Sequence, residues 1–210
     1  MEAPRQQKLY TPFRYWNRLL PTTGMLSFAS FLVAVLSGVV LAFFYDVHRP
    51  LDSLEVMATL NRPAHLFRSL HYWSGQLFMG FFLLHFLEYL LLRGDRKILY
   101  GVWSRLVLSL FFIFFVMLSG FMLKGDREGL LATRILRGLL AELDSGQGLS
   151  FAVLGQKSSL QILYMHHIAT ATIFVLYIIV EHSRRIWPTS SATLYALAAS
   201  LILSVALPVA

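Results

Sequence analysis

The chain has 210 residues, of which 57% are hydrophobic and 14% charged. This apolar share exceeds that of an ordinary soluble domain and indicates an integral membrane protein. The formal net charge of +7 comes from basic residues near the ends of apolar segments, so membrane lipid explains it better than nucleic acid, which we do not expect as a partner. The absence of cysteine excludes disulfides, thiolate-held iron–sulfur clusters and thioether-linked cofactors on this chain.

Four apolar runs are each about long enough to cross the ~30 Å hydrocarbon core of a bilayer. They cover residues 25–45, 71–92, 106–123 and 163–181. A fifth run, Thr193 to Ala210, is shorter and rich in Ala and Ser. We therefore predict an all-α membrane protein, a four-helix transmembrane bundle with a possible fifth C-terminal helix. The predicted parts are an interfacial segment 1–23, the bundle 24–186 with a surface loop 124–159, and a hydrophobic tail 187–210.

The first 23 residues mix aromatic with basic side chains, which is typical of an interfacial segment on the positive side of a membrane. Lys and Arg are concentrated in the short segments of this side, at the N-terminus, in 93–105 and in 183–192. The positive-inside rule then predicts a cytoplasmic N-terminus, and we expect a bacterial cytoplasmic membrane. The opposite side is called outer below, and the N-terminal side inner.

The first predicted helix runs from Gly24 to Tyr45, and Gly24 and Gly38 lie fourteen residues apart in it. The second contains His71 and His85 at the same spacing and ends at Arg93. Fourteen residues bring two side chains back to nearly one helix face, about 21 Å apart along the axis. Two histidines at the ends of a membrane helix are costly unless they have a function. The connection 46–70 between these helices is expected to be a loop, with His48 and His65 in it.

The third predicted helix, Leu106 to Leu123, carries Gly120 near its end. Apolar residues at helical spacing in Glu128 to Leu143 predict short helices along the membrane surface, broken by Gly146 and Gly148.

The fourth predicted helix, Ser159 to His182, carries His167 and His182 fifteen residues apart. Two crossings separate it from the second helix, so the two run in the same direction. His71 and His167 then form an outer pair, and His85 and His182 an inner pair. The rotation away from the face of His182 is about 60° for His167 and about 160° for His166, which favours His167.

Two neutral imidazoles on facing helices are typical of the axial ligands of a six-coordinate haem, with the porphyrin inside the bundle. Zinc would need further ligands at each level. Small residues would make room for the ring, namely Gly24, Gly38, Gly75 and Gly120. With both axial positions filled, the predicted chemistry is electron transfer. A single histidine in such a segment is more often a hydrogen-bonded polar residue, so a haem-free transport subunit with a proton path is the rival from another class.

These residues resemble the N-terminal half of cytochrome b, the dihaem subunit of quinol-oxidising cytochrome bc complexes, and most closely its short form in b6f-type complexes. The resemblance covers about Arg14 to Arg185. It rests on LSGVVLAFFY (36–45), RSLHYWSG (68–75), LLH (83–85), SGFML (119–123) and GQKSSLQILYMHH (155–167).

The resemblance implies two b-type haems. His71 and His167 would ligate an outer, lower-potential haem, and His85 and His182 an inner, higher-potential one. It places Arg68 beside the outer haem, where a guanidinium can neutralise a propionate. The four glycines fall at or near the small positions against the porphyrin faces. Arg184 and Arg185, by depth alone, are candidates for the inner propionates.

The resemblance also implies quinone and quinol as ligands and an electron-transfer role in a respiratory or photosynthetic oxidoreductase complex that this chain does not complete alone. Expected partners are a Rieske iron–sulfur protein or c-type cytochrome and a C-terminal-half cytochrome b subunit, in a homodimer of complexes. Glu88 and Glu181 are candidate proton acceptors near an inner quinone site.

This chain departs from the family pattern in the third helix and after it. Leu106 stands where the third helix usually has its first glycine, and Lys124-Gly125 where Pro-Trp is usual. These departures leave open a cytochrome b anchor of another quinone-linked redox complex.

Overall fold

The computed structural model describes residues 21–91, 100–143, 146–156, 159–183 and 187–209, and the regular structure throughout these ranges is helical. The long helices are α2 (Thr23–Ala42), α4 (Arg62–Leu91), α5 (Tyr100–Met122) and a continuous rod made of α8 (Gln161–Ala169), η2 (Thr170–Val175) and α9 (Leu176–His182). The others are α3 (Pro50–Leu60), α6 (Arg127–Ala141), α7 (Gly146–Leu154) and α10 (Ser190–Ala206).

Three helices of the described chain are long and apolar enough to cross a membrane: Thr23–Ala42, Arg62–Leu91 and Gln161–His182. The apolar stretches of α5 and α10 are shorter, Leu106–Met122 and Ser190–Ala206. Large apolar side chains such as Leu36, Leu84 and Phe111 are exposed on the outside of these helices. This surface suits contact with lipid tails rather than water. The helices therefore indicate an integral membrane protein.

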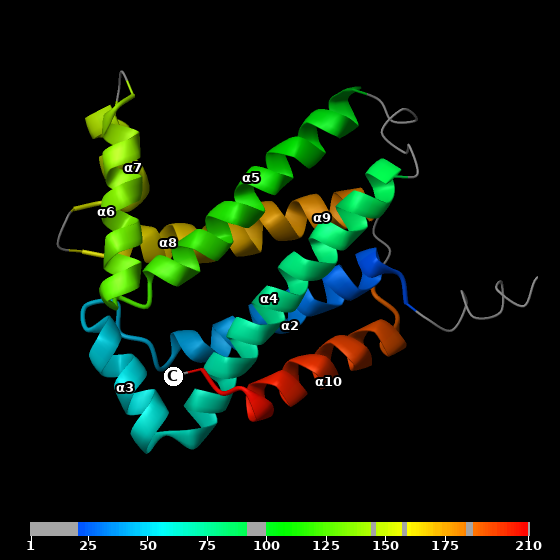
Figure 1. The fold of residues 1–210 in the computed structure, drawn as a ribbon, viewed down its shortest axis with the longest axis horizontal. Helices are drawn as coiled ribbons and strands as arrows, with labels where there is room; N and C mark the ends of the chain where they lie inside the picture. The colour runs from blue at the N-terminus through cyan, green and yellow to red at the C-terminus, as the bar shows by residue number, and fades with distance from the viewer. Residues whose placement is uncertain (1–20, 92–99, 144–145, 157–158, 184–186, 210) are drawn as a thin grey trace, which may run out of the picture.

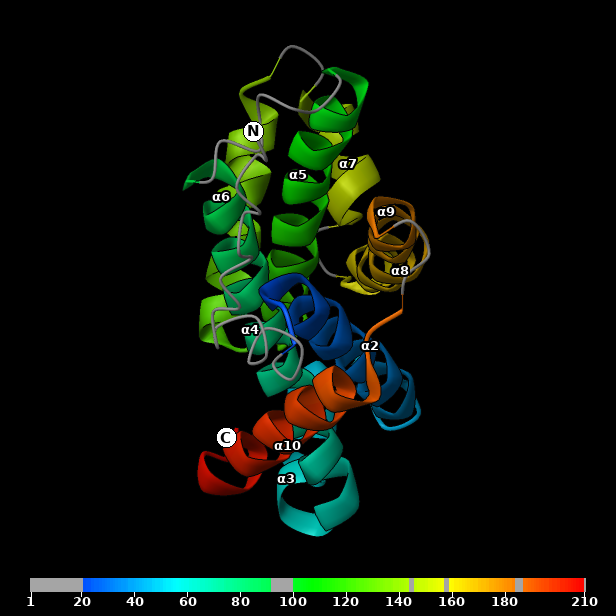
Figure 2. The ribbon, with the colours of Figure 1, turned by 90° about the vertical axis from the view of Figure 1, so that its right-hand side faces the viewer.

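The long helices form two groups that lie side by side (Figures 1 and 2). In the first group α2 packs along α4, and α10 lies against both. In the second group α5 packs along α8 and η2. The short helices α6 and α7 lie together across one end of the second group, where α6 touches α5 and α7 touches α8.

An apolar cluster joins the two groups halfway along the helices. Its buried members are Phe28 and Phe31 of α2, Phe78 of α4, Ile113 of α5 and Val175 of η2. Phe78 lies midway between His71 and His85 in sequence, so this cluster lies between the two histidine levels. Close packing of this kind leaves few voids larger than a water molecule. The space around the outer histidines is therefore separated from the space around the inner histidines by packed side chains.

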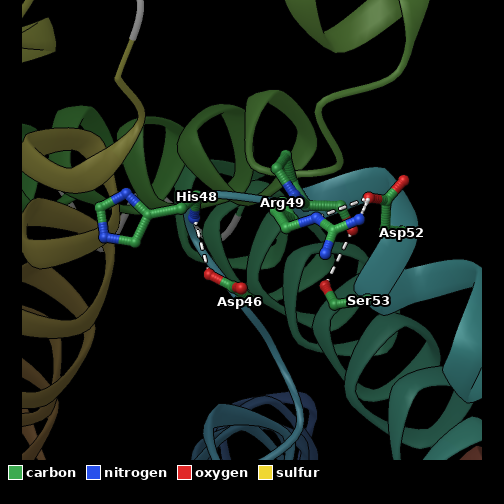
Figure 3. Close-up of polar contacts among 6 residues, drawn as sticks. Asp46, His48, Arg49, Asp52 and Ser53 are labelled. Atoms are coloured by element: carbon green, nitrogen blue, oxygen red, sulfur yellow. Dashed lines mark hydrogen bonds and ion pairs between the residues drawn. The ribbon is translucent and has the colours of Figure 1, made fainter.

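The connection 46–70 is not the loop that we predicted, because it forms α3 and the first turns of α4. Proline is compatible with the first turn of a helix, and Pro50 and Pro63 lie at these two helix starts. His65 is therefore a helical residue of α4. Before α3, the Asp46 carboxylate accepts a hydrogen bond from the His48 amide at 2.9 Å, as Figure 3 shows.

The start of α3 is fixed by polar contacts of its own (Figure 3). The Arg49 guanidinium pairs with the Asp52 carboxylate at 2.7 Å, and the Ser53 hydroxyl donates to the Pro50 carbonyl at 2.8 Å. Both ends of the Arg49–Asp52 pair are mostly exposed, so it contributes little to stability.

The connection between α5 and α8 forms α6 where the apolar spacing of Glu128 to Leu143 predicts a helix, and it forms α7 after that stretch. Asp126 caps α6, since its carboxylate accepts a hydrogen bond from the Gly129 amide at 2.8 Å. Burial raises the pKa of the Asp126 carboxyl, but hydrogen bonds from Lys124 and the Gly129 amide outweigh this effect. The pKa therefore lies below its usual value, and the nearby charge of Arg68 lowers it further.

The predicted break at Gly146 is confirmed, because α6 ends at Ala141 and α7 begins at Gly146, but Gly148 does not interrupt α7. A side chain at Gly146 would collide with the Ala141 carbonyl oxygen, 2.6 Å from the position of its Cβ. Glycine is needed there because the start of α7 lies directly against the end of α6.

The hydrophobic tail forms α10, which packs through small residues spaced four apart: Ala192, Ala196, Ser200 and Ser204. Ala29 of α2 is fully buried in the same contact. After α10, the Trp73 indole donates a hydrogen bond to the Leu207 carbonyl at 2.8 Å. The Val209 amide donates to the Ser69 hydroxyl at 3.2 Å. The tail is thus fastened to the α2–α4 group of its own chain.

Candidate functional site

Four histidines converge as two pairs, each bridging the two helix groups. The ring centres of His71 (α4) and His167 (α8) lie 6.2 Å apart. Those of His85 (α4) and His182 (α9) lie 6.1 Å apart. The fourteen residues from His71 to His85 separate the two pairs by about 21 Å along α4. The chain therefore presents two nearly identical histidine gaps, one above the other.

The π-helical segment η2 explains how fifteen residues on one helix match fourteen on the other. In an uninterrupted α-helix, His182 would be rotated about 60° away from the face of His167. Because a π-turn holds more residues than an α-turn, η2 takes up the additional residue between them. The assumption of a uniform α-helix was wrong here, and His182 reaches His85 as closely as His167 reaches His71.

Main-chain carbonyls orient both outer imidazoles. Nδ1 of His71 lies 2.8 Å from the Ala34 carbonyl oxygen. Nδ1 of His167 lies 3.1 Å from the Val116 carbonyl oxygen and 3.0 Å from the Ser119 hydroxyl. A carbonyl can only accept a hydrogen bond, so Nδ1 carries the proton in both rings. The lone pair is then on Nε2, and this is the tautomer in which a histidine binds a metal through Nε2.

Of the two inner imidazoles, His85 has side-chain groups beside it instead of a main-chain carbonyl. Nδ1 of His85 lies 3.5 Å from the Thr23 hydroxyl, which itself donates a hydrogen bond to the Glu88 carboxylate at 2.6 Å. Within the described residues, no side-chain hydrogen bond of His182 is seen. Thr23 and Ser119 were not among the predicted site residues, although each directly precedes a predicted glycine, Gly24 or Gly120.

Three of the four predicted glycines lie against a histidine ring. A Cβ at Gly38 would lie 2.8 Å from Cε1 of His71, and one at Gly24 would lie 3.2 Å from Cε1 of His85. A Cβ at Gly120 would lie 3.0 Å from Cε1 of His167. Gly75 is less crowded, with the Met117 sulfur 3.9 Å away as its nearest neighbour.

His71, His85 and His167 each have a glycine against the ring, whereas none of the described glycines lies against His182. α5 packs along α8 and η2, and Gly120 lies against His167; the fourteen-residue period of Gly24 and Gly38 would then place Leu106 at the level of His182.

Arg68 is 9% exposed and lies on α4 three residues before His71. Its Nη1 lies 3.5 Å from the Val209 carbonyl oxygen, so the end of the tail lies beside it. Arg184 and Arg185 are outside the described residues. His166 lies on the other side of α8, where its Nε2 is 2.9 Å from the Ala152 carbonyl oxygen of α7. Glu181 is exposed beside His182.

The donor set fits a haem iron. A porphyrin supplies four nitrogens, which leaves two opposite positions for protein ligands. With metal–imidazole bonds of about 2 Å and about 1.1 Å from nitrogen to ring centre, two such imidazoles have centres about 6 Å apart. The observed separations match this value, and the three glycines allow the rings to lie close to the neighbouring backbones. His71, His167, His85 and His182 are the residues that would hold the two irons.

An all-helical membrane fold with two stacked histidine pairs fits the class of membrane-embedded b-type cytochromes. Residues 14–179 match the family model described as Cytochrome b/b6/petB. The chain therefore belongs to the cytochrome b/b6 family.

Two curated relatives are cytochrome b6 proteins. That of Gracilaria tenuistipitata var. liui is 29% identical over 119 residues, and that of Auxenochlorella protothecoides is 28% identical over 118 residues. Each alignment covers 55% of this chain and 55% of the relative. The chain thus spans about half the length of the curated relatives it matches.

Proposed function

We propose that this chain is a dihaem cytochrome b subunit that carries electrons across the membrane between quinol and quinone sites of a cytochrome bc-type complex. The observation that carries the proposal is the pair of equal histidine gaps, 6.2 and 6.1 Å between ring centres, at two depths of one bundle. Bound haem supplies a one-electron carrier at each level. With two histidines as ligands at each level, a bound haem would have no open position for oxygen or substrate, so the chemistry that it would supply is electron transfer.

The residues of the chain have separate roles in this proposal. His71 and His167 hold the outer haem, and their bonds to main-chain carbonyls keep Nε2 of each ring directed at the iron. His85 and His182 hold the inner haem. The Arg68 guanidinium neutralises a propionate of the outer haem, and Arg184 and Arg185 are assigned to the inner propionates by depth.

Partners complete the function. We assign the quinol oxidation site to a C-terminal-half cytochrome b subunit. We assign the role of high-potential acceptor to a Rieske iron–sulfur protein or c-type cytochrome. The complex is a homodimer in a bacterial cytoplasmic membrane, with the N-terminus in the cytoplasm and lipid around the exposed apolar faces. Since α10 already covers one side of α2 and α4, we expect partners to approach from the α5 and α8–α9 side.

The test is a potentiometric titration of the complex purified with its partner subunits, followed optically, with a quinol analogue added afterwards to the oxidised complex. The proposal predicts two b-type components, each with one electron, and reduction of haem by the quinol. Two haems that quinol cannot reduce would favour an anchor of another redox complex and overturn the quinone assignment. A protein without haem would overturn the proposal and favour the haem-free proton path.

A further inference from the structure

The hydroxyl beside the inner histidine His85 is itself bound to a carboxylate, whereas the Ser119 hydroxyl beside the outer His167 donates to the Val116 carbonyl. Thr23 is the first residue of α2, and Glu88 lies one helical turn after His85 on α4. The Thr23 hydroxyl lies between the two, 3.5 Å from Nδ1 of His85 and 2.6 Å from the Glu88 carboxylate. The three side chains form a line from carboxylate to hydroxyl to imidazole.

The direction of these hydrogen bonds follows from the chemistry of the groups. An ionised carboxylate can only accept, so the Thr23 hydroxyl gives its one proton to Glu88. The oxygen of Thr23 keeps its lone pairs and is free to accept the proton on Nδ1 of His85. The contact of 3.5 Å is long for a hydrogen bond, and the short contact to Glu88 holds the hydroxyl in place.

A carboxylate connected to a ligating histidine makes the ligand more basic, and such partners tune the bound metal. A main-chain carbonyl, as found behind His71 and His167, is neutral and has a weaker effect. A more basic ligand stabilises oxidised iron relative to reduced iron. The negative charge of Glu88, transmitted through Thr23, therefore favours the oxidised state of an iron on His85.

We propose that Thr23 and Glu88 are positioning residues that act through His85 to lower the midpoint potential of the inner haem. This inference rests on the proposed function, in which His85 and His182 hold that haem. This effect of the Thr23–Glu88 pair, called the relay here, would narrow the difference in midpoint potential between the two haems. It would thereby limit the driving force of electron transfer from the outer to the inner haem.

The test compares midpoint potentials of both haems in four variants of the full chain. Thr23→Val removes the hydroxyl but keeps the shape, and Glu88→Gln removes the charge at nearly constant size. Thr23→Ser restores a hydroxyl. Glu181→Gln is the matched control, because it removes an exposed inner-side carboxylate beside His182 that has no hydrogen bond within the described residues.

We expect Thr23→Val and Glu88→Gln each to raise the equilibrium constant for reduction of the inner haem about threefold to tenfold, or ~30–60 mV for a one-electron couple. The outer haem should not change, and the combined variant should shift no further than the larger single one. Thr23→Ser should match the unsubstituted protein, and Glu181→Gln should shift the inner haem less than twofold.

Two results would overturn the relay. One is an unshifted inner potential in Glu88→Gln with both haems bound. The other is an equal shift in Glu181→Gln, which would mean that charge acts through space. If Thr23→Val does not retain haem, the comparison of Glu88→Gln with Glu181→Gln decides alone. A lack of haem in the unsubstituted protein would overturn the proposed function instead, so the two failures are distinguishable.

Discussion

The outer and inner histidine pairs have almost the same ring separation but different surroundings. Both outer imidazoles donate to main-chain carbonyls, of Ala34 and Val116, and each has a glycine against it. Of the inner pair, His85 has a hydroxyl and a carboxylate behind it. Both outer imidazoles are therefore held by main-chain carbonyls, with the Ser119 hydroxyl added at His167, whereas the hydroxyl beside the inner His85 is bound to a carboxylate. We expect the outer site to be sensitive to added volume and the inner site to be sensitive to changes of polar groups.

The largest expected effect is the selective loss of one haem. His71→Ala removes one of two axial ligands at the outer level, so haem content should fall from two per chain to one, and only the inner component should remain. His85→Ala should give the reverse. The measurement is haem per chain together with a redox titration. His166→Ala is the matched control and should keep both haems, because His166 bonds to α7. Two haems retained in His71→Ala would contradict the ligand assignment.

The second-largest effect tests how well each histidine pair tolerates a larger side chain at the neighbouring glycine. In Gly38→Ala the added Cβ would lie 2.8 Å from Cε1 of His71, whose ring is held by the Ala34 carbonyl and cannot move away. Overpacking of this kind costs about 1–3 kcal/mol, so the outer haem should be lost about fivefold to a hundredfold faster to a haem scavenger.

Gly24→Ala should have a smaller effect on the inner haem, because its Cβ would lie 3.2 Å from His85. Gly80→Ala serves as the control on α4, since a Cβ there would meet nothing within 4 Å. Equal rates of haem loss in all three variants would show that the contacts of the glycines do not matter.

A smaller effect is expected from Ser119→Ala at the outer site. The Val116 carbonyl still accepts the proton of His167 Nδ1 when the hydroxyl is removed, so the neutral partner of the ring remains. The equilibrium constant for reduction of the outer haem should change less than about twofold, which is below ~20 mV. Redox titrations of Ser119→Ala and Thr23→Val compare the shift at the outer haem with the shift at the inner haem. A shift as large as that of Thr23→Val would remove the distinction between the two sites.

The smallest effect concerns the connection that follows the outer end of α5. Asp126→Ala removes the cap of α6 and should cost about 1 kcal/mol of stability without shifting either haem potential. Since the folded-state pKa of Asp126 is lowered, its stabilisation is present at neutral pH and is lost as the pH falls through that lowered pKa. Thermal unfolding in detergent at several pH values measures this. Asp52→Ala, at an exposed ion pair, should change the unfolding temperature less at every pH.

The sequence predicted the helices and the histidine spacing because both depend on simple periods. Fourteen residues return a side chain to one helix face, so the common period of Gly24–Gly38 and His71–His85 could be read directly. The structure pairs them in antiparallel order, Gly24 with His85 and Gly38 with His71.

Features that depend on local backbone or tertiary contacts were not predictable in the same way. The π-turn in η2 has no clear sequence signal, so the fifteen-residue spacing left a rotation of about 60° unexplained. The start of α4 at Arg62 was missed because Pro63 was treated as a loop residue rather than a helix start. Thr23 and Ser119 acquire their roles only when the helices pack.

The most direct test of the proposed dihaem cytochrome b is the haem content of the unsubstituted protein. It is measured as b-type haem per chain after purification from the native membrane together with its partner subunits. We predict two haems per chain, resolved as two one-electron components. One haem would contradict the equivalence of the two histidine gaps and direct attention to Leu106, the residue in register with His182. No haem would contradict the central claim.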